Sequence, residues 1–217
     1  MGRIIDWILD AFYPTKCILC RKLLKPGRPS ICPSCQMTLP LAEGIRRRGD
    51  YFSGCVSAVF YEGRMKEAIL RYKFGDAEAY APAFGELVAE RIYSEMDGKY
   101  DLISWVPLAP DHLRKRGFDQ AYLIARNAAE RLRKPLVPVL KKKRRVKAQS
   151  GTKTREERRR NIAGAYTVID PAVVKEKRIL LIDDIITTGS TLSECAKTLL
   201  KAGAEDVVCT TLAMTPK

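Results

Sequence analysis

Four consecutive aliphatic residues, Ile179–Ile182, follow a charged segment and directly precede two aspartates. A short apolar run bounded in this way predicts a strand that is buried on both faces of a parallel sheet. Farther along the chain, apolar residues recur at helical spacing from Leu192 to Leu200, and Gly203 can end that helix. The pattern therefore predicts a strand, a polar turn and a helix in that order.

Similar patterns occur elsewhere along the chain. Predicted strands span residues 55–61, 102–108, 136–140, 165–169 and 207–213, and predicted helices span residues 65–72, 83–92 and 121–132. With 217 residues, the chain is long enough for one α/β domain and a small appendage. We predict an α/β fold over residues 51–217, with a parallel sheet flanked by helices, and a small module over residues 1–50.

The polar turn after the predicted strand is the first candidate for chemistry. Asp183 and Asp184 come where the strand should emerge at its carboxyl edge, which is where open α/β sheets bind ligands. The loop Thr187-Thr188-Gly189-Ser190-Thr191 then opens the helix, and its backbone N–H groups and hydroxyls suit a phosphate. The two carboxylates suit ribose hydroxyls, or a hydrated Mg²⁺ that a pyrophosphate carries.

Other motifs of this kind fit less well. No Lys follows Gly189, so the loop is not the P-loop of nucleoside triphosphatases. A receiver domain carries its acidic pair on its first strand, whereas only 33 residues follow Asp184 (217 − 184). A purely structural alternative is an acidic turn followed by a helix cap rich in Ser and Thr. The stretch resembles the phosphoribosyl-pyrophosphate (PRPP) loop of type I phosphoribosyltransferases. In those enzymes the acidic pair holds the ribose hydroxyls and the loop holds the 5′-phosphate.

Two C-x2-C pairs lie in the N-terminal part of the chain. Cys17 and Cys20 form the first pair, and Cys32 and Cys35 form the second. Two such pairs can complete a tetrahedron around Zn²⁺ with no open position, so we predict a structural zinc in a zinc-ribbon-like module. Two disulfides or a redox C-x-x-C are the alternatives. The following segment, Arg46–Gly49, is predicted to be an exposed linker.

The net charge of +14 is unusual for a chain whose composition is otherwise that of a globular protein. Such a charge implies an anionic partner: a polyphosphate, nucleic acid or an acidic surface. Eleven Lys and Arg residues lie between Lys141 and Arg160, among them Lys141, Lys142, Lys143, Arg144, Arg145 and Arg158. This run lies between two predicted strands of the sheet. It is therefore predicted to fold over a bound polyanion as a lid, or to follow a nucleic-acid backbone.

A second basic cluster includes Arg114 and Arg116 and ends at Gly117, just before a predicted helix. We expect it to lie in a loop at the carboxyl edge of the sheet and to bind pyrophosphate. Residues 1–13 predict a hydrophobic N-terminal helix without a signal-peptide cleavage pattern. No segment is apolar over the length that a membrane span requires. We expect a cytoplasmic protein, with any membrane association made through partners.

Taken together, the motifs resemble the competence protein F (ComF) family. The resemblance rests on the two C-x2-C pairs, Val106-Pro107-Leu108, Arg114-x-Arg116-Gly117-Phe118-x-Gln120, Gln149, Arg158, Asn161 and the loop from Asp183 to Gly189. The chain departs from the family at Asp119, where the family usually has Asn, and in its very basic stretch 141–147.

The resemblance implies a zinc module joined to a type I phosphoribosyltransferase-like domain, with a role in the uptake of transforming DNA. It implies that Asp183 and Asp184 are the catalytic pair and bind PRPP, with Mg²⁺ on the phosphates. Pro107, Leu108, Arg114, Arg116 and the loop from Thr187 to Thr191 are the implied phosphate-binding residues. The basic run itself, rather than the resemblance, predicts Lys141–Arg145 as lid or nucleic-acid contacts, and Arg158 and Asn161 are assigned to the same group.

Two functional hypotheses remain open. The first is a PRPP-binding accessory protein that holds single-stranded DNA and works with DNA-uptake machinery, with or without turnover. The second is a conventional phosphoribosyltransferase of nucleotide or small-molecule metabolism, with an unknown acceptor and no nucleic-acid role. Both use the PRPP loop, which chiefly positions and neutralises its ligand.

Overall fold

The centre of the molecule is a four-stranded sheet in which every neighbouring pair is parallel. The structure is a computed structural model that describes residues 16–25, 30–75, 77–143 and 160–216. In spatial order the strands are β1 (Gly54–Phe60), β6 (Asp206–Met214), β5 (Arg178–Ile186) and β2 (Leu102–Trp105). This arrangement confirms the predicted α/β class with a parallel sheet.

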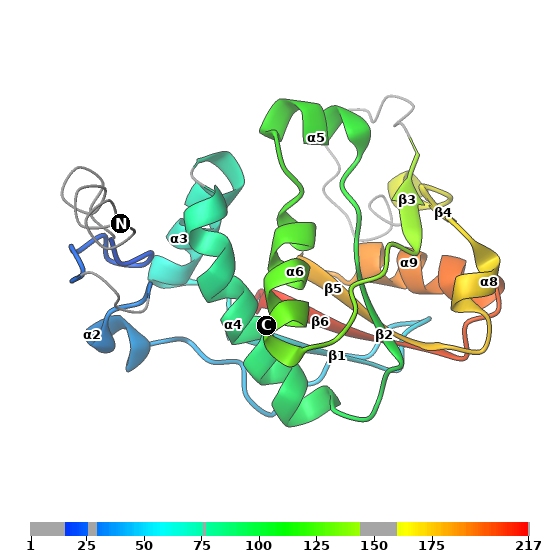
Figure 1. Ribbon diagram of the computed structural model, residues 1–217, viewed down its shortest axis with the longest axis horizontal. Coiled ribbons are helices and arrows are strands. Elements are labelled where there is room, and N and C mark those ends of the chain that lie inside the picture. Colours follow the sequence, from blue (N-terminus) through cyan, green and yellow to red (C-terminus); the bar gives the residue numbers. More distant parts are fainter. Residues whose placement is uncertain (1–15, 26–29, 76, 144–159, 217) are drawn as a thin grey trace, which may run out of the picture.

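Helices cover both faces of the sheet (Figure 1). On one face lie α3 (Gly63–Phe74), α4 (Ala77–Met96) and α6 (Gln120–Leu132); on the other lie α8 (Pro171–Val174) and α9 (Ser190–Lys201). The alternation of side chains along β5 explains why two cores form. Leu180 and Ile182 belong to the core under α4 and α6, and Ile179 and Leu181 belong to the core under α9. All four are fully buried, as the aliphatic run predicts.

The sequence predicted two further strands of the main sheet, at residues 136–140 and 165–169, and this prediction is wrong. β3 (Leu140–Lys142) and β4 (Tyr166–Val168) pair with each other, antiparallel, in a separate two-stranded sheet. Leu136 makes one bridge to Ile103 at the open edge of β2. Pro138 follows, and a proline cannot donate to the ladder. The chain therefore leaves the main sheet there.

The region after β2 also differs from the prediction. The strand ends at Trp105, and the basic cluster lies in a short helix, α5 (Pro110–Arg116), rather than in a loop. Gly117 ends this helix with a φ of 81°, a conformation that favours glycine. Asp119 then caps α6 by accepting from the backbone N–H of Tyr122, and it also accepts from the N–H of Leu108 at 2.8 Å.

The cysteine-containing segment lies at one end of the molecule, beyond α3, and includes α2 (Pro33–Gln36) (Figure 1). Its residues Cys17, Ile18 and Cys35 are buried in the same core as α3 and α4. The chain then follows the outer edge of β1, where Leu41 and Arg47 form antiparallel bridges. Arg46–Gly49 is thus not a free linker.

The predicted N-terminal helix lies outside the described residues. Within the residues that the structure describes, no helix is both long and apolar enough to cross a membrane.

Candidate functional site

A cavity of about 390 Å³ lies beside the carboxyl end of β5. Many of the predicted site residues line it, from three separate parts of the chain: Asp183, the whole loop Thr187–Thr191, Lys142 and Lys143 from the end of β3, and Asn161. Ile162, Ile185 and Leu192 add apolar surface. The cavity therefore combines an acid, hydroxyls, cations and apolar walls.

The loop from Thr187 to Thr191, called the phosphate loop after the ligand that the sequence predicts, owes its shape to Gly189. This residue has a φ of 77° and immediately precedes α9, so the chain reverses sharply between β5 and the helix. The helix start has no side-chain cap, and the Thr188 and Ser190 hydroxyl groups lie 2.9 Å apart. Hydroxyls and backbone N–H groups thus meet at the positive end of a 12-residue helix, an arrangement suited to an anion.

Asp183 is the acidic group of this cavity. Burial, followed by the neighbouring carboxylate of Asp184, raises the pKa of Asp183 to about 8. The backbone N–H of Asp184, which donates to Asp183 Oδ1 at 2.8 Å, acts in the opposite direction, as do Lys73 and Lys142. A hydroxyl-rich or cationic ligand would favour the ionised carboxylate.

Asp184 lies on the other face of β5, because the aspartates are within the strand rather than after it. Its Oδ2 lies 2.9 Å from Nζ of Lys73 in the last turn of α3. The two side chains are only 17% and 19% exposed, so this ion pair is partly shielded from water. The sequence offered no local indication of Lys73, which is 111 residues away (184 − 73).

Lys142, at the end of β3, and the residues that follow β3 and precede β4 form another wall of the cavity. Lys142 extends its ammonium group over the ring of Tyr166, 5.0 Å from the ring centre. Burial raises the pKa of the Tyr166 hydroxyl and of the Cys195 thiol well above their usual values, so both are neutral. Gly164, near the start of β4, donates to Glu194 on α9 at 2.7 Å, which ties this wall to the helix.

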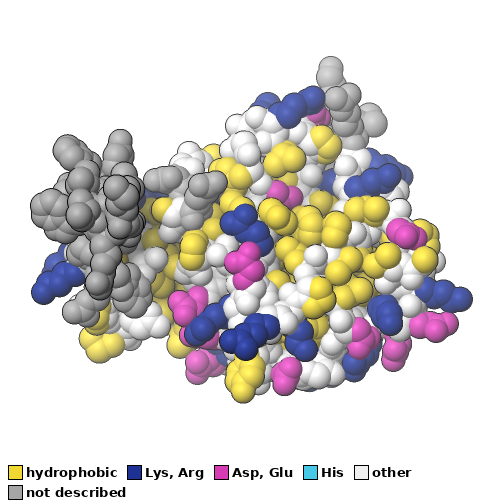
Figure 2. All heavy atoms as spheres, in the orientation of Figure 1, with side chains coloured by type: hydrophobic (Ala, Val, Ile, Leu, Met, Phe, Trp, Pro, Cys, Tyr) yellow, Lys and Arg dark blue, Asp and Glu magenta, His cyan; other side chains and the backbone are white. Residues whose placement is uncertain are grey.

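Several predicted site residues do not line the cavity. Arg114 pairs with Asp111 within α5, and Arg116 lies over the ring of Phe74, 5.4 Å from its centre. Lys141 is exposed, and Pro107 and Leu108 lie in the segment between β2 and α5. The face in Figure 2 shows Lys and Arg in separate groups over α5 and near β3. Arg144, Arg145 and Arg158 lie outside the described residues.

The four predicted metal ligands come together in the N-terminal module. The sulfur atoms of Cys17, Cys20, Cys32 and Cys35 all lie within 4.8 Å of one another, and those of Cys20 and Cys32 are 3.7 Å apart. Tetrahedral zinc with Zn–S bonds of about 2.3 Å places sulfurs about 3.8 Å apart. The cluster therefore has the composition and the spacing of a four-thiolate metal site.

The surroundings of the cluster differ from one thiol to the next. Burial alone would raise the pKa of Cys17, but backbone N–H groups, including that of Cys32 at 3.4 Å, lower it to about 6. Burial and the adjacent cysteines raise the pKa of Cys35 to about 12. A cation held among the four sulfurs would favour the thiolate at each of them.

Comparison with known proteins shows the family of this chain. Residues 119–217 match the family model of the phosphoribosyl transferase domain. Competence protein ComFC of Streptococcus pneumoniae (strain ATCC BAA-255 / R6) is 31% identical over 189 residues, covering 87% of this chain and 77% of the relative. The chain belongs to the ComF family of competence proteins.

Other similarities cover between 63% and 90% of this chain. DNA utilization protein YhgH of Escherichia coli (strain K12) is 25% identical to this ComF-family chain over 209 residues, covering 90% of each protein. Among solved structures, a purine phosphoribosyltransferase from Pyrococcus horikoshii matches with a TM-score of 0.39 and 22% identity. That match covers 63% of this chain and 74% of the other.

Proposed function

We propose that this ComF-family protein binds PRPP in the cavity beside β5. The observation that supports the proposal is the meeting of Asp183, the Thr187–Thr191 loop and the Lys142–Lys143 wall around one space of about 390 Å³. The loop would hold the 5′-phosphate, and Asp183 would accept from the ribose hydroxyls. Asp184 would contact the ligand only if its ion pair with Lys73 were broken.

Charge neutralisation is the second requirement for PRPP. Mg²⁺ bound with PRPP supplies positive charge on the pyrophosphate, and the oxygen ligands of Asp183 and the loop hydroxyls suit this hard cation. Lys142 and Lys143 face the same space and would neutralise phosphate oxygens from the other wall. We also propose Pro107, Leu108, Arg114 and Arg116 as pyrophosphate contacts, which requires α5 to approach the cavity.

In a cell this site would serve DNA uptake. The names of the relatives, a competence protein and a DNA utilization protein, support that role. We propose that the stretch from Lys141 to Arg145, together with Arg158 and Asn161, contacts single-stranded DNA. Three described members, Lys142, Lys143 and Asn161, line the cavity itself, so bound PRPP and bound DNA would influence each other. DNA-uptake proteins would be the protein partners.

We further propose Zn²⁺ as the occupant of the four-cysteine cluster. The cluster supplies four sulfur ligands and leaves no position for a substrate, so the metal would be structural. It would hold the module against α3, where Arg71 donates to the carbonyl oxygens of Ile18 and Leu19.

Calorimetric titration with PRPP and Mg²⁺ tests the main proposal. Asp183→Asn should weaken binding about 100-fold, because charge-assisted hydrogen bonds to two hydroxyls contribute about 1.5 kcal/mol each. Asp97→Asn, at an exposed carboxyl in the turn after α4, is the matched control and should bind as the wild type does. Unchanged affinity in Asp183→Asn, with the fold intact, would rule out this site.

The apolar part of the cavity favours a second candidate function, phosphoribosyl transfer to an acceptor. Ile162, Ile185 and Leu192 could pack against a planar base. In that reaction the acceptor nitrogen attacks the anomeric carbon and loses its proton, while the carbon–oxygen bond to pyrophosphate breaks. Pyrophosphate release that depends on an added nucleobase would favour this function; PRPP binding without release would favour the accessory role.

A further inference from the structure

A second cavity lies beside the phosphate loop, with a volume of about 490 Å³. Its lining consists of three consecutive arginines, two loop threonines and the end of the chain after β6: Arg46, Arg47, Arg48, Thr187, Thr188, Thr215 and Pro216. No acidic side chain is among these residues. An anion entering this space would therefore meet arginines and threonines, and no carboxylate among the lining residues.

Arg47 fixes the position of this arginine segment relative to the loop. Its guanidinium donates to the carbonyl oxygen of Thr187 at 2.8 Å and also to that of Thr215. Its Nε is buried and has no hydrogen-bond partner among the described residues. Arg47 thus holds the segment against Thr187, the first residue of the phosphate loop.

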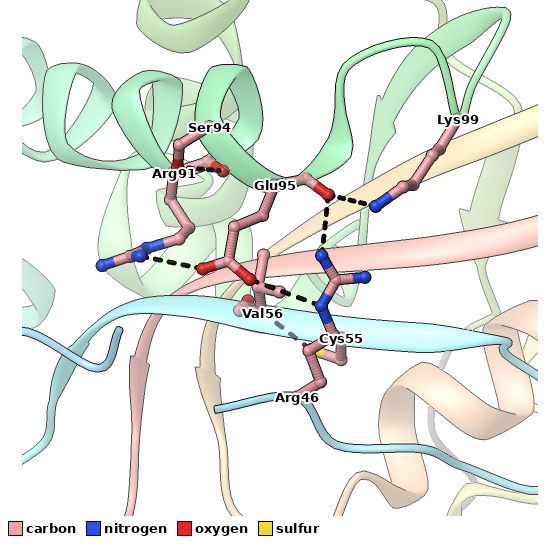
Figure 3. Close-up of polar contacts among 7 residues, drawn as sticks. All are labelled: Arg46, Cys55, Val56, Arg91, Ser94, Glu95 and Lys99. Carbon is pink, nitrogen blue, oxygen red and sulfur yellow. Dashed lines mark hydrogen bonds and ion pairs between the residues drawn. The ribbon is translucent and has the colours of Figure 1, made fainter. Parts of the chain in front are cut away.

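Arg46 and Arg48 leave charge available at the cavity. Arg46 reaches Glu95 near the end of α4, where Nε lies 3.4 Å from Oε2, yet its side chain is 48% exposed (Figure 3). Glu95 also pairs with Arg91 at 2.8 Å, and Arg91 has a second carboxylate partner in Glu43 at 3.9 Å, so it is the exposed part of the Arg46 side chain that a ligand can reach. Arg48 is exposed, and no ion pair or hydrogen bond of its side chain occurs within the described part of the chain.

The two cavities adjoin each other at the phosphate loop, because Thr187 and Thr188 line both of them. Lys142 and Lys143 lie on one side of the loop, and Arg46–Arg48 lie on the other. A single small phosphate ester would contact only one of these two sets of cations. Cations distributed along a path instead suit a polyanion with regularly spaced charges.

We propose that the Arg46–Arg48 cavity binds a backbone phosphate of single-stranded nucleic acid whose strand crosses the phosphate loop. Arg47 orients the loop, and Arg46 and Arg48 contact the phosphodiester. The site is separate from the ribose and pyrophosphate contacts, so it does not depend on PRPP being the ligand of the first cavity. A free phosphate ion has the same chemistry, and it is the competing occupant.

Fluorescence anisotropy with a labelled 15-nucleotide single strand, over a range of salt concentrations, tests the site in the full chain. Removing the contacts to this phosphate with Arg46→Ala and Arg48→Ala should weaken binding about tenfold at about 0.15 M salt and make the log–log slope shallower by about 0.7. The control removes two charges elsewhere, with Arg131→Ala and Lys134→Ala at the end of α6, where Arg131 is 66% exposed. The control should keep the wild-type slope.

Calorimetry of the same variants with inorganic phosphate and with PRPP and Mg²⁺ separates the outcomes. We expect PRPP affinity to be unchanged in the Arg46→Ala, Arg48→Ala variant, since those residues do not line the first cavity. Equal losses of DNA affinity in this variant and in the control would overturn the inference, as would phosphate binding at the arginines with DNA affinity unchanged. A wild type that binds DNA through these arginines but not PRPP would refute only the proposed function.

Discussion

At the carboxyl end of β5, each face of the sheet carries an aspartate, and the two aspartates have different surroundings. Asp183 lines an open cavity with the phosphate loop, on the α9 face. Asp184 faces α3, where Lys73 already neutralises it. The face whose aspartate lines the open cavity can receive a ligand, whereas the face with the Lys73–Asp184 ion pair connects the site to the rest of the fold.

The connection on the Asp184 face extends to the cysteine module. Lys73 belongs to α3, and the same helix carries Arg71, which binds two carbonyl oxygens of the module, and Arg64, whose Nη1 lies 3.9 Å from the Cys35 sulfur. The α9 face has no residue of the four-cysteine cluster in its core. Disturbing the module should therefore affect the two faces unequally.

Metal removal should have the largest effect. Replacing Cys20 and Cys35 by Ser, or adding a chelator, should destabilise the module by a large part of the roughly 10 kcal/mol that zinc contributes to small four-ligand modules. Hydrogen exchange should increase in α3 and α4 while α9 keeps its protection. Ser34→Ala, an exposed change in the same module, is the control. Equal loss of protection in α3 and α9 would contradict the difference between the faces.

Breaking the Lys73–Asp184 pair should have an intermediate effect. Lys73→Met and Asp184→Asn should each lower the free energy of unfolding by about 1–3 kcal/mol, because each leaves the other charge partly buried and unpaired. The double variant should cost less than the sum of the two. Denaturant unfolding measures all three variants, and Lys66→Met, an exposed lysine on the same helix, is the control. Strict additivity would show that the two charges do not interact.

The pH dependence of stability should show the smallest effect, on the Asp183 face. Because the pKa of Asp183 is raised to about 8 in the folded state, this group favours folding at low pH, and its contribution is lost as the pH rises from about 4 to 8. Asp183→Asn should make unfolding less pH-dependent in that window and stabilise the protein by about 0.5–2 kcal/mol at pH 8. An unchanged pH profile would contradict the burial of this carboxylate.

Some of the fold could be predicted from short-range patterns. The aliphatic run Ile179–Ile182 indicated a strand buried on both faces, and the helix after Gly189 followed from apolar spacing. The predicted end of this strand, just before the aspartates, was wrong, because Ile185 and Ile186 continue β5 beyond them. The apolar residues Ile185 and Ile186 were the signal in the sequence that the strand continues. Within a strand, Asp183 and Asp184 must face opposite sides of the sheet.

By itself, the sequence determined the local units: the two C-x2-C pairs, the phosphate loop with its glycine, and the fold class. These units depend on spacings of a few residues, which a linear pattern records directly. Only the tertiary structure decided which distant groups meet them. Lys73 at Asp184, Lys142 opposite the loop and Arg47 on the Thr187 carbonyl come from segments far apart in the chain. Their positions follow from how the helices and the edge segment pack on the sheet, and this packing depends on the whole core rather than on any short stretch of sequence.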